Sequence, residues 1–189
     1  LRCTYCLPPG YRNFSEPETW LTFDEIERVI RAFTELGVRR VRLTGGEPLT
    51  RHHLPELAAR LQALPHLEDL SLSTNGMRLK KYARALRQAG VQRVNVSLDS
   101  LQAERFASIT GGGKLNKVLE GLTAANQAGM SPVKINMVVM KGVNDDEVDD
   151  MVRFCIEQDF TLRFIETMPM GDTGRSASGH YLSLEEVRR

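Results

Sequence analysis

Two cysteines near the start of the chain have the spacing of a metal-binding or redox pair. They are Cys3 and Cys6, in the stretch Leu1-Arg2-Cys3-Thr4-Tyr5-Cys6. Thiolates at this spacing can bind zinc or an iron–sulfur cluster, or they can form a redox disulfide. The pair alone does not decide between these chemistries, and zinc is the safer first interpretation.

A second stretch that could do chemistry is Thr44-Gly45-Gly46-Glu47-Pro48. It closes a predicted strand that begins at Arg40. Glycines at the end of a strand let the backbone come close to a ligand, because they carry no Cβ. The same two glycines could also form only a tight turn between a strand and a helix.

The composition is that of an ordinary globular protein. The 189 residues are enough for one domain with a sizeable core, and the net charge of +1 gives no electrostatic reason to bind nucleic acid or a membrane surface. No apolar run approaches the length of a membrane span. Three cysteines do not make a disulfide framework, so a reducing cytoplasm is the expected location.

The elements that must position these residues alternate along the chain. Strands are expected at 40–44, 70–73, 93–97, 133–139 and 162–166, and helices at about 23–36, 54–64, 80–89, 102–109, 117–128 and up to 158, with a last one opening at 183. Capping boxes at Thr22–Glu25 and Asn144–Glu147 are expected to start two of the helices. Alternation of this kind predicts parallel strands joined by right-handed crossovers.

Each predicted strand carries a polar residue at every second position. These residues are Arg42 and Thr44, Ser71 and Ser73, Asn95 and Ser97, Lys134 and Asn136, and Arg163. Successive side chains of a strand point to opposite faces, so each strand has one polar and one apolar face. A flat sheet covered by helices on both faces would bury those polar groups. The pattern instead predicts a barrel whose polar interior holds the ligand.

Several other features have ordinary structural explanations. Gly111-Gly112-Gly113-Lys114 resembles a phosphate loop, but it follows a helix and lacks the Walker spacing, so we interpret it as a helix break. Cys155 lies among apolar residues and is expected to be buried. The histidines show no metal-ligand spacing and are expected at the surface. By contrast, Arg42 and Lys134 would be costly inside a barrel unless an anion accompanies them.

Together, the cysteine pair and the Gly-Gly-Glu-Pro stretch resemble the radical S-adenosylmethionine (SAM) superfamily. Further stretches narrow the resemblance to the MoaA-type GTP 3′,8-cyclase family: Val41–Pro48, Ser73–Gly76, Val94–Ser100, Ile109–Gly111, Val133–Asn136 and Leu162–Met168. They follow one collinear order along the whole chain. The resemblance implies a partial six-stranded (β/α) barrel of the radical SAM type over residues 1–189, incomplete at both ends and lacking the first strand and the C-terminal region.

The resemblance also implies an activity and its cofactors. Members of this family begin molybdenum cofactor biosynthesis. Electron transfer to a [4Fe–4S] cluster splits SAM, and the radical produced takes hydrogen from the ribose C3′ of GTP, which then bonds to C8 of guanine. The implied partners are GTP, an electron donor and a downstream molybdopterin-precursor synthase, with a homodimer possible and no nucleic acid or membrane involved.

Residue roles follow from the same resemblance. Cys3 and Cys6 match ligands of the cluster. The residues that match SAM contacts are Tyr5, Gly46, Ser97 and Met168. The residues that match GTP contacts are Arg42, Ser73 and Lys134. Position 73 more usually holds threonine in this family, and the hydroxyl is kept.

The family pattern includes parts that the 189 residues do not contain. These are a third cluster cysteine four residues before Cys3, an N-terminal arginine associated with GTP, and C-terminal cysteines for a second [4Fe–4S] cluster. We therefore expect an interior fragment that is inactive by itself. The alternatives are a radical SAM peptide maturase and a non-enzymatic zinc-binding scaffold.

Overall fold

The computed structural model describes residues 1–6, 20–167 and 178–187. Within them, five strands form one parallel sheet in the order β1-β2-β3-β4-β5, which is also their order in the chain. The strands are β1 (Arg40–Leu43), β2 (Asp69–Thr74), β3 (Val91–Ser97), β4 (Val133–Val138) and β5 (Thr161–Ile165). All five were predicted, each to within two residues at its ends.

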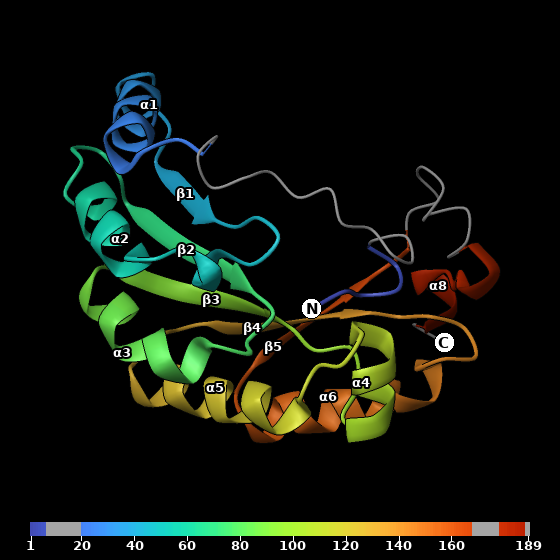
Figure 1. The fold of residues 1–189 in the computed structure, drawn as a ribbon. Coiled ribbons are helices and arrows are strands. Elements are labelled where there is room, and N and C mark those ends of the chain that lie inside the picture. The colour runs from blue at the N-terminus through green and yellow to red at the C-terminus, as the bar shows by residue number, and fades with distance from the viewer. Residues whose placement is uncertain (7–19, 168–177, 188–189) are drawn as a thin grey trace.

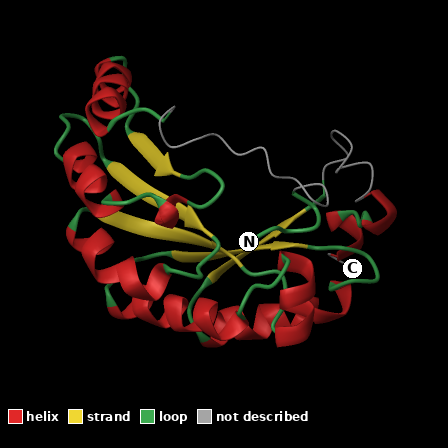
Figure 2. Ribbon diagram, viewed as in Figure 1, coloured by secondary structure: helices red, strands yellow, loops and turns green. Residues whose placement is uncertain are grey.

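Helices alternate with the strands along the chain, beginning with one that precedes β1. They are α1 (Phe23–Glu35), α2 (Leu54–Gln62), α3 (Leu79–Gln88), α4 (Ala103–Thr110), α5 (Leu115–Gln127), α6 (Val148–Glu157) and α8 (Leu184–Val187). Short 3-10 turns occupy Pro48–Thr50, Asp145–Glu147 and Ser178–His180. Figures 1 and 2 show the sheet as a curved arc with α2, α3, α5 and α6 along its convex side. This arc is the predicted partial barrel.

The core lies between the convex face of the sheet and the helices. In β4, Val133, Ile135 and Met137 are buried, whereas the alternate residues Lys134 and Asn136 are only partly buried. The alternation predicted from the sequence therefore sorts the side chains as expected: the apolar set packs under the helices and the polar set takes the other face. None of the described helices is long and apolar enough to cross a membrane.

Two capping boxes were predicted, and one of them is wrong. At α1, the Thr22 hydroxyl accepts from the Glu25 amide, and the Glu25 carboxylate accepts from the Thr22 amide at 2.7 Å. At α6, the Asn144 side chain caps no helix amide, and the helix begins only at Val148. The side chains of Asn144 and Glu147 bond instead to the segment after β3, which local sequence cannot show.

The three glycines between α4 and α5 do break the helix, as predicted. Gly111 caps α4 in the left-handed conformation, with φ of 66°. It also makes room for the cysteine segment, because a Cβ at this position would lie 2.9 Å from the carbonyl oxygen of Arg2. The other structural expectations also hold: Cys155 is buried, and the four histidines are exposed.

Candidate functional site

The cysteine segment packs against the C-terminal end of α4. The amides of Arg2 and Thr4 donate to the carbonyl oxygens of Thr110 and Ile109, each at 2.9 Å. A turn closed by the Cys6 amide on the Cys3 carbonyl at 3.0 Å brings the two thiols onto one short loop. Both thiols are free; Cys6 is exposed and Cys3 is half-buried.

Tyr5 connects this loop to the end of β3. Its hydroxyl donates to Oδ2 of Asp99 at 2.8 Å, and Asp99 lies two residues beyond Ser97. Burial raises the pKa of the Asp99 carboxyl to about 6 and also raises the pKa of the Tyr5 phenol. Burial likewise raises the pKa of the Cys3 thiol, with the Asp99 charge adding to the effect. A bound metal would favour the thiolate and so oppose this shift.

The Gly45-Gly46 loop lies at the same edge of the sheet. It follows β1, and Glu47 joins it to the end of β2: the carboxylate accepts from the Thr74 hydroxyl and the Asn75 amide, each at 2.7 Å. Gly45 has φ of 149°, which favours glycine, whereas a Cβ on Gly46 would meet no atom of the described residues within 4 Å. Among these residues, Gly46 therefore borders open space rather than packed protein.

The polar face of the sheet brings the other predicted residues into neighbouring rows. In the strand register, Arg42 lies beside Ser71, and Ser71 lies beside Arg93. The next row toward the C-terminal ends holds Ser73, Asn95 and Lys134, and the row after it holds Ser97, Asn136 and Arg163. The three residues matched to GTP thus occupy two adjacent rows, and Ser97 lies one row closer to the cysteine segment. Met168 lies outside the described residues.

This face is rich in positive charge. Arg93 forms an ion pair with Asp69, which is the single carboxylate among the described strand residues on this face. Arg42 donates only a long hydrogen bond of 3.5 Å to the Ser71 hydroxyl. Burial lowers the pKa of the Lys134 ammonium, and the charges of Arg163, Arg93 and Arg42 lower it further. An anion bound here would relieve both effects.

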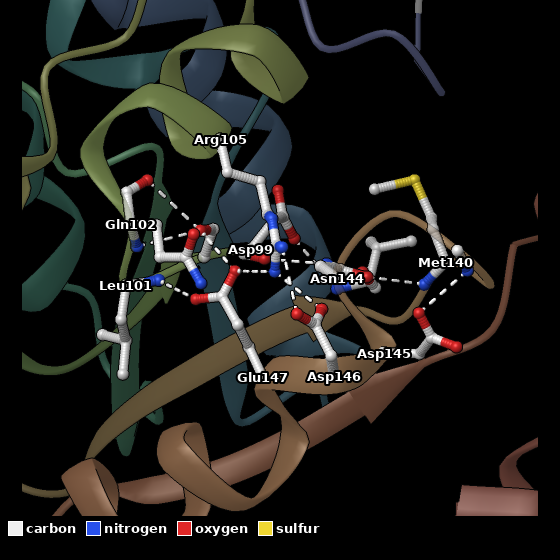
Figure 3. A network of polar contacts seen from close by, with 12 residues as sticks. Asp99, Leu101, Gln102, Arg105, Met140, Asn144, Asp145, Asp146 and Glu147 are labelled. Carbon is white, nitrogen blue, oxygen red and sulfur yellow. Dashed lines mark hydrogen bonds and ion pairs between the residues drawn. The ribbon is translucent and has the colours of Figure 1, made fainter.

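Sequence reasoning missed several polar residues of this region. Asp99, Arg105, Asn144 and Glu147 form a buried network between the segments that follow β3 and β4 (Figure 3). A polar residue directly after a buried strand, as in Ser97-Leu98-Asp99-Ser100, was the one signal available. Asp69 and Arg93 also fit the alternation, but they were not singled out.

The site offers donors and acceptors that suit the expected groups. Two thiols on one loop fit two positions of a cluster, although no group of three or more metal-ligating side chains occurs among the described residues. Two buried side-chain oxygens, Asn136 Oδ1 and Thr167 Oγ1, have no hydrogen-bond partner among the described residues. Two surface hollows of about 460 and 620 Å³ lie over α3 and α5, and neither is lined by a predicted site residue.

Comparison with known proteins supplies the family. The model of the radical SAM superfamily matches residues 1–155. The chain belongs to the radical SAM superfamily. This membership removes the basis for a zinc-binding scaffold, which rested on the cysteine pair alone.

Curated relatives of this radical SAM chain are similar along its whole length. GTP 3′,8-cyclases from Petrotoga mobilis and Listeria monocytogenes are each 46% identical to it, over 100% and 99% of this chain and 58% and 56% of the relative. The enzyme of that name from Hydrogenovibrio crunogenus is 49% identical over 98% of this chain and 56% of its own length. The chain thus spans slightly more than half the length of these relatives.

Solved structures show the same fold at lower identity. Streptococcus suis SuiB bound to S-adenosylmethionine matches all of this chain and 42% of its own, with a TM-score of 0.78 and 19% identity. Methylornithine synthase (PylB) matches 88% of this chain and 50% of its own, with a TM-score of 0.68 and 18% identity. These matches agree with the radical SAM barrel and say nothing about the substrate.

Proposed function

We propose that the protein containing this chain cyclises GTP to (8S)-3′,8-cyclo-7,8-dihydroguanosine 5′-triphosphate, the first step of molybdenum cofactor biosynthesis. The observation that carries the proposal is the cationic face beside the cysteine segment, with Arg42, Lys134 and Arg163 on it and Asp69 already paired to Arg93. A nucleoside triphosphate supplies the several negative oxygens that such a face lacks. The 46–49% identity to GTP 3′,8-cyclases supports the same substrate.

The residues of this chain divide into three groups in the proposal. Cys3 and Cys6 hold two positions of a [4Fe–4S] cluster, with the further cysteines, including those for a second cluster, outside these 189 residues. SAM is contacted by Tyr5, Gly46, Ser97 and Met168. GTP is contacted by Arg42, Ser73 and Lys134. When bound, the cluster and SAM together supply a carbon radical able to take hydrogen from a sugar.

The protein's own contribution is to bind, orient and shield the reactants. The strand register separates Ser97 from the Ser73 and Lys134 row by one row, so a ligand held by the cations lies next to one held at the end of β3. Residues 1–189 act as one barrel unit in this proposal. An electron donor and a downstream molybdopterin-precursor synthase complete the list of partners, in the cytoplasm and without nucleic acid or membrane.

The test is an anaerobic assay of the intact protein with GTP, SAM and dithionite. We expect a brown, iron-containing protein that releases 5′-deoxyadenosine and the cyclised nucleotide, both measured by mass spectrometry. Omission of SAM and the Cys3→Ser variant serve as controls and should abolish both products. Cleavage of SAM with GTP left unchanged would reject GTP as the substrate and favour a peptide maturase.

A further inference from the structure

The hydroxyl of Tyr5 links the cysteine segment to the end of β3. Two backbone bonds also join the segment to the end of α4, a helix that itself lies outside the sheet. The bond from Tyr5 to Asp99 Oδ2, at 2.8 Å, reaches across 94 positions of the sequence. It therefore relates the two cysteines directly to the end of a strand.

Asp99 is itself fixed from the other side. It is 1% exposed, and its Oδ1 accepts from the Val138 amide at 2.9 Å. Its backbone carbonyl accepts from the Asn144 amide group at 2.7 Å, and the same nitrogen donates to the Val138 carbonyl at 2.9 Å. Asn144 Oδ1 accepts from the Met140 amide at 2.7 Å, so the side chain of Asn144 is fully engaged (Figure 3).

A second set of bonds holds the segment that follows Asp99. The buried carboxylate of Glu147 accepts from the Ser100 hydroxyl and the Leu101 amide, each at 2.7 Å, and from Arg105 at 2.6 Å. Arg105 continues to Asp146 at 2.7 Å. These bonds hold the backbone directly after Asp99, and hydrogen bonds to the buried Glu147 carboxylate are strong, so they limit movement of Asp99 as well.

The two oxygens of the Asp99 carboxylate have different partners. Oδ1 accepts from the Val138 amide and so joins the end of β3 to β4, whereas Oδ2 accepts from Tyr5 of the cysteine segment. We propose that Asp99 is a positioning residue: through Tyr5 it sets the Cys3–Cys6 loop, and so the cluster, at a fixed place relative to Ser97. This inference rests on the proposed cluster and SAM site, and it adds a role for a side chain that contacts neither.

The first test uses the chain without cofactor. The variant Tyr5→Phe removes only the hydroxyl. Asp99→Asn keeps an acceptor for the Val138 amide but presents an uncharged NH2 group to Tyr5 in place of the carboxylate oxygen, so both variants should fold and both lose the charge-assisted bond. Hydrogen exchange of the Arg2 and Thr4 amides should become about tenfold faster or more in each variant, as expected for the loss of one hydrogen bond to a charged group. Unchanged melting temperatures would show that the effect is local.

Matched controls exist for both substitutions. Tyr82→Phe, on α3, and Asp149→Asn, at the exposed start of α6, remove the same chemical groups at positions that, within the described part of the chain, form no hydrogen bond with the cysteine segment or with Asp99. Neither should alter exchange at Arg2 or Thr4. In the double variant, Tyr5→Phe should add little to Asp99→Asn, because the two groups share one bond. Additive effects, or no change in exchange, would overturn the proposal.

The second test uses the intact protein reconstituted with iron and sulfide. The Asp99→Asn variant decides this test, because Asp99 is not one of the proposed SAM contacts. It should keep its iron content, yet the change that SAM produces in the electron paramagnetic resonance spectrum of the reduced cluster should differ from that of the wild type. Faster exchange with an unaltered SAM response would overturn the positioning role. A wild type that binds no iron would overturn the proposed function itself, a failure that the exchange experiment keeps separate.

Discussion

Individual cations on the polar face differ in how their charge is compensated. Arg93 has Asp69 as an ion-pair partner, whereas Arg42 has a long hydrogen bond to a hydroxyl. The pKa of Lys134 is lowered by burial and then by neighbouring guanidinium groups. Arg42 and Lys134 are thus the cations that gain most from an added anion. They are also the two cations that match GTP contacts by sequence.

This difference predicts the effect of removing either charge in the intact protein. Lys134→Ala and Arg42→Ala should each weaken GTP binding by about ten- to a hundredfold, the value of one charge-assisted contact. SAM binding and SAM cleavage without GTP should change much less. Calorimetric titration with each ligand measures both, and Lys117→Ala, on the outer helix α5, is the control. Equal losses for the two ligands would reject the phosphate role.

The two glycines after β1 lead to different predictions. Gly46 has an ordinary φ and open space at its Cβ position, so Gly46→Val should leave the melting temperature of the chain nearly unchanged. In the intact protein it should abolish SAM binding and preserve iron content, because the added side chain fills the ligand's space. Gly45→Ala should instead lower the melting temperature, because a φ of 149° strains any residue other than glycine. Normal SAM affinity of Gly46→Val would indicate an ordinary turn.

At the scale of elements, side chains of one loop bond to the end of a neighbouring strand and hold the two in place. Glu47 is the clearest case: three donors from two segments converge on its carboxylate, from Leu49, Thr74 and Asn75. The loop after β1 is therefore tied to the end of β2. This bond set explains why the loop holds a defined place although it has no regular secondary structure of its own.

Removing the Glu47 carboxylate should destabilise the whole chain. Glu47→Ala leaves three donors without their acceptor, and we expect a loss of at least about 1.5–3 kcal/mol in the free energy of unfolding, the value of one hydrogen bond to a charged group. Urea unfolding followed by circular dichroism measures it. Glu56→Ala, an exposed residue on α2, should change stability by less than about 0.5 kcal/mol. A loss as small for Glu47→Ala would contradict the role assigned to this carboxylate.

The elements themselves were predictable because their signals are local. Every predicted strand is present and carries the alternation of polar and apolar residues, and the Thr22 box placed the start of α1. The Asn144 box failed because its two side chains have better partners more than 40 residues away, at Asp99 and Leu101. Asp99 was missed for the same reason, because its side chain bonds to Tyr5 and Val138, which are distant in the sequence. Spacing in a sequence shows neighbours along the chain and not across it.

At the scale of the whole molecule, helices cover one face of the arc (Figure 2). The strand register places the polar residues on the other face. The covered face contains the core, including Leu70, Val94 and Ile135. The polar face carries excess positive charge, and the folded chain brings these like charges together. We therefore expect the protein to become more stable when an anion binds to this face.

The sign of the pH effect follows from Lys134. Its pKa in the folded chain lies below the ordinary value of 10.5, so the unfolded chain holds this proton more tightly. Protonated Lys134 thus opposes folding at neutral pH, and this opposition fades as pH rises through the folded pKa toward 10.5. In anion-free buffer, Lys134→Met should melt at a higher temperature than the wild type at pH 7, and the difference should shrink as the pH rises toward 10.5.

Tripolyphosphate should reverse this order, because it interacts with the charge that methionine lacks. Added to the wild type at pH 7, it should raise the melting temperature in proportion to the logarithm of its concentration above the dissociation constant. The rise should be smaller for Lys134→Met and unchanged for Lys117→Met, which keeps the polar face intact. Sodium chloride at equal ionic strength separates specific binding from screening. A rise of the same size in all three proteins would show that the anion binds elsewhere and would reject Lys134 as part of its site.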